Sequence, residues 1–340
     1  MAVSLQLTGP YLLFLGDVPS MAYAKTALGI AQWAPESCVA QLRFPDCEID
    51  TGLPDMNVAE AAAAGAKSLI IGSAPVGGAI QENWLPVFLE AIAAGMDIVS
   101  GLHAKLESYP ELREAATQAG VRLLDVRVPP DNLPIGNGQK RSGKRLLTVG
   151  TDCSVGKKYT VLALTKALKE KDIACDYRAT GQTGIMIGGA GMPIDAVVAD
   201  FIAGAAESLS PANNEDHWDL IEGQGSLFQP AFSGVSLGLL HGSQPDAIVV
   251  CHDPAREHII GCPDHAVPSV QSCIETNLQL GRLTNPNITC VGVSVNTSGL
   301  TSEQRATTLQ ALRNETGLPC VDPLVEGVGD IVDELCRTCL

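Results

Sequence analysis

The chain has 340 residues, more than one hydrophobic core usually organises, so two domains are expected. A formal charge of −16 argues against nucleic-acid and anionic-membrane partners, because phosphate groups attract positively charged surfaces. The eleven cysteines are odd in number and scattered through apolar stretches, which indicates reduced thiols in a soluble cytoplasmic protein. Neither a secretory signal nor a membrane span is evident in the sequence.

The first half of the chain alternates strand-length apolar runs with helical stretches. Strands are predicted at 11–15, 38–42, 68–71, 97–100 and 122–126, and helices at 58–64, 83–94 and 110–119. The strand runs are continuously apolar, as in parallel sheets that helices cover on both faces. We therefore predict an α/β domain with a parallel sheet over residues 1–135.

A polar stretch rich in proline and glycine, VPPDNLPIGNGQKRSGK at 128–144, is typical of a domain linker. Beyond it the strand and helix alternation resumes. Strands are predicted at 145–149, 174–178, 218–221, 247–251 and 288–295, and helices at 157–171, 194–208, 270–280 and 301–315. We predict a second α/β domain with a parallel sheet over residues 145–340.

The segment GTDCSVGKK, which starts at Gly150, lies between a predicted strand and a predicted helix. In such a phosphate-binding loop, backbone amides and the positive end of the helix converge on an anion, and Lys157 adds a full charge. We therefore predict that the cofactor is bound by Gly150, Thr151, Asp152, Cys153, Ser154, Val155, Gly156, Lys157 and Lys158.

Lys158 stands where loops that bind a magnesium nucleotide carry serine or threonine. The loop resembles the GTDTxVGKT loop of dethiobiotin synthetase, in which the final threonine is a magnesium ligand. An ammonium group cannot coordinate a cation, so we predict that a phosphate or pyrophosphate binds here without a metal. Coenzyme A carries such groups.

Residues just beyond the carboxyl ends of parallel strands line the ligand crevice of an open sheet. DLIEGQGSLFQP, at 219–230, places Glu222 there, much like the VEGAGG segment of the synthetase group. RATGQTGIMIGG, at 178–189, follows another strand. Asn296 ends a late strand, where its amide could meet an adenine edge. GSAPVGGAI, at 72–80, could bring backbone amides to a substrate.

Four segments together resemble the DUF1611 family: GTDCSVGKK, ATGQTGI, IEGQGSLFQPAFSGVSLGLLHGSQPDAIVVCHDP and, in the first half, GLHAKLESYPEL. The resemblance implies a Rossmann-like first domain and a second domain like the P-loop NTPases. Through the D-glutamate N-acetyltransferases of the family, it also implies transfer of acetyl from acetyl-CoA to the amine of an acidic D-amino acid. The synthetase group further suggests a homodimer.

Such a transfer needs a base for the amine, donors for the developing oxyanion and partners for two substrate carboxylates. The candidates for substrate binding are Arg43, Lys105, Arg178, Gln182 and Thr183. The candidates for the catalytic base are Glu222, His103 and Asp17, with His241 as a further one. Each of these residues could instead be a solvated or capping group on the surface.

Several alternatives remain open at this stage. Cys153 could form an acetyl-cysteine intermediate, because a thiol near a helix start can be acidic. The residues Cys251, His252, His258, Cys262 and His265 are of metal-ligating types, but their spacing matches no familiar zinc site, so no metal is expected. The chain could also be a nucleotide-dependent ligase or kinase with Glu222 as a magnesium ligand, or a metabolite-sensing module.

Overall fold

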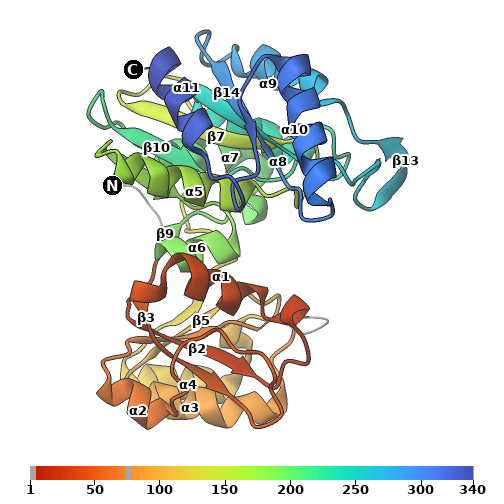
Figure 1. Cartoon of the computed structure of the whole chain (residues 1–340). Coiled ribbons are helices and arrows are strands. Elements are labelled where there is room, and N and C mark those ends of the chain that lie inside the picture. The colour runs from red at the N-terminus through yellow and green to blue at the C-terminus, as the bar shows by residue number, and fades with distance from the viewer. Residues whose placement is uncertain (1–4, 74–77, 340) are drawn as a thin grey trace. The chain divides into compact units, whose positions relative to one another are not determined.

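The computed structural model describes residues 5–73 and 78–339, with Ala22 described by its backbone alone. The middle of the predicted amide loop at 72–80 therefore lies outside the described residues. The chain forms two compact units. We call residues 5–129 with 181–193 the N-terminal unit, and residues 130–180 with 194–339 the C-terminal unit (Figure 1).

The N-terminal unit contains a five-stranded parallel sheet in the order β3-β2-β4-β5-β6. The strands are β2 (Tyr11–Gly16), β3 (Cys38–Arg43), β4 (Ser68–Ile71), β5 (Asp97–Ser100) and β6 (Leu123–Asp125). The helices between them are α1 (Lys25–Trp33), α2 (Val58–Ala63), α3 (Leu85–Ala93) and α4 (Pro110–Ala119). The strand order reverses between β2 and β4, and doubly wound sheets bind ligands at such a switch point.

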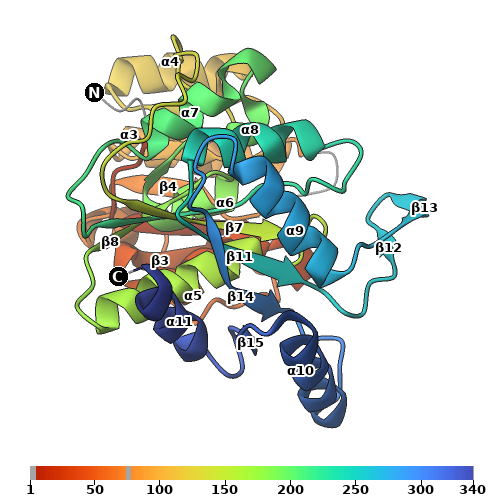
Figure 2. The ribbon, with the colours of Figure 1, turned by 90° about the horizontal axis from the view of Figure 1, so that it is seen from above.

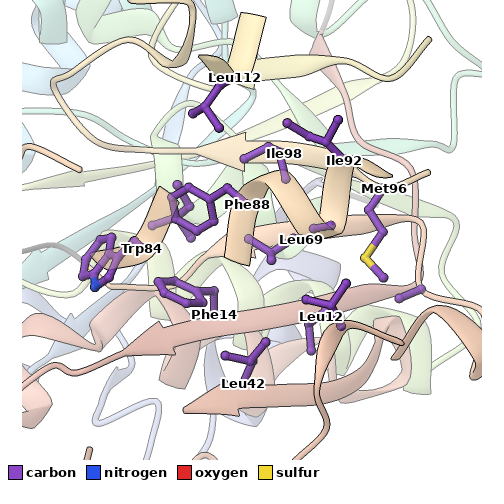
Figure 3. Packing of buried hydrophobic residues seen from close by; sticks show 14 of the residues in the cluster. Leu12, Phe14, Leu42, Leu69, Trp84, Phe88, Ile92, Met96, Ile98 and Leu112 are labelled. Atoms are coloured by element: carbon purple, nitrogen blue, oxygen red, sulfur yellow. The ribbon is translucent and has the colours of Figure 1, made fainter. Parts of the chain in front are cut away.

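The core of this unit packs one face of the sheet against α2, α3 and α4 (Figure 3). Phe14 from β2 lies at its centre, with its ring 5.2 Å from that of Trp84 and 5.0 Å from that of Phe88. Both contacts are edge to face, the arrangement that aromatic quadrupoles favour. The fully buried strands β2, β4 and β5 explain the continuous apolar runs in the sequence.

A short segment from the second half of the chain completes the N-terminal unit. It consists of α6 (Gln182–Gly188) and β9 (Ala190–Gly191). Strand β9 pairs antiparallel with β1 (Leu5–Gln6), and α6 packs against α1. The chain therefore leaves the C-terminal unit after Thr180 and returns to it at Ile194.

The C-terminal unit contains a six-stranded parallel sheet in the order β15-β14-β11-β7-β10-β8. Its strands are β7 (Lys144–Gly150), β8 (Cys175–Arg178), β10 (Trp218–Ile221), β11 (Ala247–His252), β14 (Thr289–Val295) and β15 (Cys320–Val321). Its helices are α5 (Lys157–Glu170), α7 (Ile202–Leu209), α8 (Ser233–Ser243), α9 (Val270–Gly281), α10 (Ser302–Thr316) and α11 (Gly329–Cys339). The predicted helix at 194–208 begins as two 3-10 turns and becomes α-helical only at Ile202.

Helices cover both faces of this sheet (Figure 2). Helices α5 and α11 pack on one face, while α8 and α9 pack on the other. A two-stranded hairpin of β12 (His258–Ile259) and β13 (Cys262–Ala266) extends away from the sheet of its unit. The predicted α/β fold class with two parallel sheets is confirmed. Within the described part of the chain, every helix is too short or too polar for a membrane span.

Candidate functional site

The loop from Gly150 to Gly156 joins the central strand β7 to α5, and its conformation depends on glycine at both ends. A Cβ atom at Gly150 would lie 2.8 Å from the Val155 side chain and 3.2 Å from the carbonyl oxygen of Cys251. Gly156 has φ +106°, a conformation that side chains with a Cβ rarely adopt. The predicted loop is therefore present, and the amides of the first turn of α5 follow directly after it.

Lys157 lies inside this loop. Its side chain is only 7% exposed, and its Nζ donates a hydrogen bond to the carbonyl oxygen of Asp152 at 2.9 Å. Burial lowers the pKa of the Lys157 ammonium, because removal from water disfavours the charged form. A bound anion would supply the counter-charge and favour the ammonium. An anion bound in the loop would therefore keep Lys157 protonated.

Lys158 carries no hydroxyl, and the next aliphatic hydroxyl of α5, that of Thr160, is already used in hydrogen bonds within the protein. The ammonium of Lys158 lies 4.6 Å from the centre of the Tyr159 ring, a cation–π distance. Thr160 is fully buried, and its Oγ1 is already bonded to the Gly156 carbonyl at 3.1 Å and to Ser294 Oγ at 2.7 Å. The loop therefore keeps the glycines and the first lysine of the predicted phosphate-binding loop, while Lys158 stands in place of the hydroxyl that would bind magnesium.

Glu222 follows β10, the strand beside β7, and lies at the same edge of the sheet as the loop. It is 4% exposed, and its Oε2 accepts hydrogen bonds from Tyr177 Oη at 3.1 Å and from the Thr180 amide at 3.0 Å. Burial, together with the Glu222 charge, raises the pKa of Tyr177 well above its ordinary value. The phenol therefore remains a donor that fixes the carboxylate.

Gly223 brings this segment against the loop. A Cβ atom there would lie 1.6 Å from the Thr148 carbonyl oxygen and 3.0 Å from Cδ of Lys157. The Gly223 amide donates to Thr148 Oγ1 at 3.0 Å. Gly223 is thus in direct contact with β7 and packs close to the lysine of the loop.

Three other predicted residues of the C-terminal unit are held by protein groups. Arg178 donates to Asp219 at 2.8 Å and to Asp176 at 3.1 Å, so two carboxylates balance its charge. The amide nitrogen of the Asn296 side chain is 3.4 Å from Asp253 Oδ2, and the Asn296 backbone amide donates to the carbonyl of His252. His241 Nε2 lies 3.1 Å from the Leu280 carbonyl oxygen.

In the N-terminal unit, α6 packs beside the loop that follows β5. A Cβ atom at Gly101 would lie 3.5 Å from Cβ of Gln182, and the Thr183 hydroxyl lies 3.4 Å from that of Thr26. His103 and Lys105, which are exposed, occupy the same loop as Gly101. Gln182, Thr183 and the loop with His103 and Lys105, far apart in the sequence, are therefore neighbours in one unit.

Asp17 directly follows β2, and Arg43 is the last residue of β3. Asp17 accepts hydrogen bonds from Asn83 and Trp84, both at 2.9 Å. Slight burial opposes ionisation of Asp17, but these hydrogen bonds outweigh it and lower the pKa. Arg43 forms a two-point contact with Asp55 and lines an open cavity of about 650 Å³ that is walled by Phe44, Met56 and Val87, among others. A carboxylate of lowered pKa is a weak base, which disfavours Asp17 as the catalyst.

Two known domain families match most of the chain. Residues 43–129 match the Rossmann-like domain of unknown function DUF1611_N, and residues 134–332 match the P-loop domain of unknown function DUF1611_C. The chain belongs to the DUF1611 family. The resemblance seen in the sequence and the two predicted domain types are thus confirmed.

Two curated relatives of this DUF1611 protein are named D-glutamate N-acetyltransferase. The relative from Pseudoalteromonas sp. is 52% identical over 332 residues, which cover 98% of this chain and 100% of the relative. The relative from Tritonibacter scottomollicae is 50% identical over 326 residues, which cover 96% and 98% of the two chains. The crystal structure of a DUF1611 family protein from Anabaena variabilis, 30% identical, matches 97% of this chain and 100% of its own, with a TM-score of 0.83.

The DUF1611 loop does not favour the acetyl-cysteine alternative. Cys153 is half-buried, and burial raises the pKa of its thiol, although the nearby Lys157 charge acts in the opposite direction. The nucleophile is the thiolate, so a raised pKa leaves Cys153 less reactive at neutral pH.

The five cysteine and histidine residues considered as metal ligands do not form a cluster. In the part of the chain that the structure describes, one group of possible ligands lies within 4.8 Å, and it consists of Asp176, His217 and Asp219. Arg178 already pairs with both carboxylates of that group. A divalent cation there would have to compete with a guanidinium.

Sequence reasoning missed three residues that shape the site: Tyr177, Thr180 and Arg256. Tyr177 and Thr180 flank Arg178 and hold Glu222, a contact that the neighbouring strand ends could have suggested. Arg256 bonds to Asp152 of the loop across about a third of the chain. The sequence carries no local signal for that pairing.

Proposed function

We propose that this protein transfers the acetyl group of acetyl-CoA to the amine of D-glutamate. The observation that carries the proposal is a loop of the phosphate-binding type, with both glycines and Lys157, in which Lys158 replaces the magnesium-binding hydroxyl. Support comes from two relatives, named D-glutamate N-acetyltransferase, that share about half of their residues with this chain over nearly its whole length.

The loop suits the phosphate groups of acetyl-CoA for a chemical reason. An acetyltransferase must hold these phosphates but does not cleave them, so it needs no metal ion to activate a phosphoryl group. Loop amides, the positive end of α5 and the ammonium groups of Lys157 and Lys158 supply the counter-charge. Asn296 remains a candidate for the adenine end of the donor.

The acceptor amine must lose a proton before or as it attacks the thioester carbonyl. The Glu222 carboxylate is fixed by Tyr177 and Thr180, and the next residue, Gly223, packs against Lys157 of the proposed donor loop. His103 is exposed in a loop beside Gln182. We assign the base to His103 and propose that Lys105, Gln182 and Thr183 bind the substrate carboxylates.

We also propose a homodimer in the cytoplasm. Closed symmetric pairs are the commonest oligomers, and all eleven cysteines are free thiols, as the reducing cytoplasm favours. A solution mass near 35.5 kDa, that of one chain, would refute the dimer.

The direct test is release of free CoA from acetyl-CoA with a panel of D- and L-amino acids. We expect thiol release with D-glutamate, and none when the amino acid is omitted. Replacement of His103 by glutamine should lower kcat by about 10²- to 10⁴-fold, while the same change at His265, exposed on β13, should leave kcat unchanged. Absence of thiol release with D-glutamate would refute the acceptor, and turnover that requires ATP and magnesium would favour the ligase or kinase.

A further inference from the structure

The anion-binding loop contains a buried negative charge. The Asp152 side chain is 0% exposed, and its two oxygens accept three hydrogen bonds: Cys153 N at 2.6 Å, Arg256 Nη1 at 2.8 Å and Ile260 N at 2.8 Å. A carboxylate so far from water persists only when it is paired and hydrogen-bonded. It also stands within the loop that is to bind an anion, so its charge must be neutralised for that binding to be favourable.

Arg256 supplies the neutralising charge and also contacts the loop backbone. The same Nη1 that pairs with Asp152 donates to the carbonyl oxygen of Cys153 at 2.6 Å. The next carbonyl toward the N-terminus, that of Asp152, accepts from Lys157 Nζ at 2.9 Å. Two successive carbonyl groups of the loop are therefore each held by a cation.

This arrangement determines the direction of a loop amide. The C=O and N–H of one planar trans peptide point in opposite directions. When Arg256 holds the Cys153 carbonyl, the amide of Ser154 is turned to the opposite side. Ser154 has φ +55°, an uncommon conformation for a residue other than glycine, so the loop needs such an external restraint.

Arg256 lies in the segment that follows β11, the strand next to the loop. Strand β11 pairs with β7 and ends at His252, and the chain then passes through Arg256 into the β12–β13 hairpin. Ile260, in the turn between β12 and β13, donates its amide to Asp152, while Gln229 donates to the Ile260 carbonyl at 3.2 Å. The turn of the hairpin is thereby fixed to the anion-binding loop.

We propose that Arg256 is a positioning residue of the donor site. It cancels the charge of Asp152 and sets the peptide between Cys153 and Ser154, so that this loop binds phosphate groups without a metal ion. The inference rests on the proposed function for the identity of the anion, which is the phosphate end of acetyl-CoA. It goes beyond that function by naming a residue outside the loop on which donor affinity depends.

The test measures CoA and inorganic pyrophosphate binding by calorimetry for the wild type, Arg256→Gln, Asp152→Asn and the double variant. We expect Arg256→Gln to raise the Kd for CoA at least tenfold, because it leaves Asp152 charged and unpaired. Adding Asp152→Asn should recover most of that loss, since it removes the repelling charge. In steady state, Arg256→Gln should raise KM for acetyl-CoA with little change in kcat.

Two further variants separate positioning from general stability. Arg313→Gln is the matched control, because it removes another arginine of the same unit. Arg313 donates to the Cys320 carbonyl at 2.7 Å and faces Glu326 at 3.9 Å. We expect the CoA affinity of this variant to be unchanged. Arg256→Lys keeps the positive charge, so it should retain more affinity for CoA than the glutamine variant. The lysine variant also takes the place of the glutamine variant in the test if the latter fails to fold. Thermal unfolding of each variant is recorded alongside.

The outcomes distinguish this inference from the proposed function. If the wild type binds CoA and Arg256→Gln binds it equally well, or if Asp152→Asn gives no recovery, the positioning role is wrong. If the wild type binds pyrophosphate but not CoA, and Arg256→Gln loses pyrophosphate, the donor assignment fails while the positioning role holds. If the wild type binds neither probe, both are overturned.

Discussion

Replacement of Lys157 by alanine is expected to weaken acetyl-CoA binding by about 1.5 to 3 kcal/mol, which raises Kd roughly 10- to 150-fold. The ammonium lies within the loop, and the bonded Asp152 carbonyl holds it there. Its contact with a phosphate would be a charge-assisted hydrogen bond in a site shielded from water, where such bonds are strongest. Titration calorimetry of the two proteins with acetyl-CoA measures the difference directly.

The pH dependence of binding provides a second signature of Lys157. Burial lowers its pKa from the ordinary value of 10.5, and an anion binds the protonated form. Acetyl-CoA affinity should therefore fall as the pH rises through this lowered pKa, and the alanine variant should lack that decline. Lys166→Ala on the same helix removes an exposed lysine that pairs with Glu170 at 4.0 Å, so it should bind like the wild type. An alanine variant of Lys157 with wild-type affinity would place the donor elsewhere.

Gly223→Ala is expected to have the largest effect on stability, a loss of at least about 3 kcal/mol in the free energy of unfolding. The added methyl group would lie 1.6 Å from the backbone carbonyl oxygen of Thr148, so β7 and the segment after β10 would have to separate. The same methyl group would press on Lys157, so donor binding should weaken as well. Urea unfolding of both proteins gives the difference from the midpoints and slopes.

Gly234→Ala is the matched control for this change. Gly234 lies in α8, and a Cβ atom there would meet open space among the described residues. Because Gly234 is the second residue of α8, alanine there should stabilise by no more than the gain of about 0.5 to 1 kcal/mol that such a change gives in a helix interior. Equal stabilities of the Gly223 and Gly234 variants would show that the backbone contact at Gly223 relaxes without penalty, contrary to the tight packing of the loop.

The features that could be predicted from the sequence are those set by neighbouring residues. The glycines at 150 and 156, between a strand run and a helical stretch, define the loop by local geometry alone. Glu222 could be placed near it because parallel strands end at a common edge of the sheet. Arg178 was predicted for the same reason, but the sequence cannot show that Asp176 and Asp219 pair with its charge.

Long-range contacts were beyond sequence reasoning. The segment 181–193 follows a strand of the C-terminal unit, yet β9 pairs with β1 and so joins the other unit, a pairing of two-residue strands that leaves no periodic pattern. The interval at 128–144 has the composition of a linker, but Arg141 in it donates to carbonyl groups at the ends of α7 and α8. The composition of this interval predicts a flexible linker, but the hydrogen bonds from Arg141 to these backbone carbonyl groups fix the segment in the fold.

We propose that the loop at Gly150–Lys158 holds the phosphate groups of acetyl-CoA without a divalent cation. A crystal structure of the protein with acetyl-CoA, grown in the presence of EDTA, tests it most directly. We predict phosphate density against the loop amides and Lys157. Density for the donor at another site, or binding that appears only when magnesium is restored, would contradict the claim.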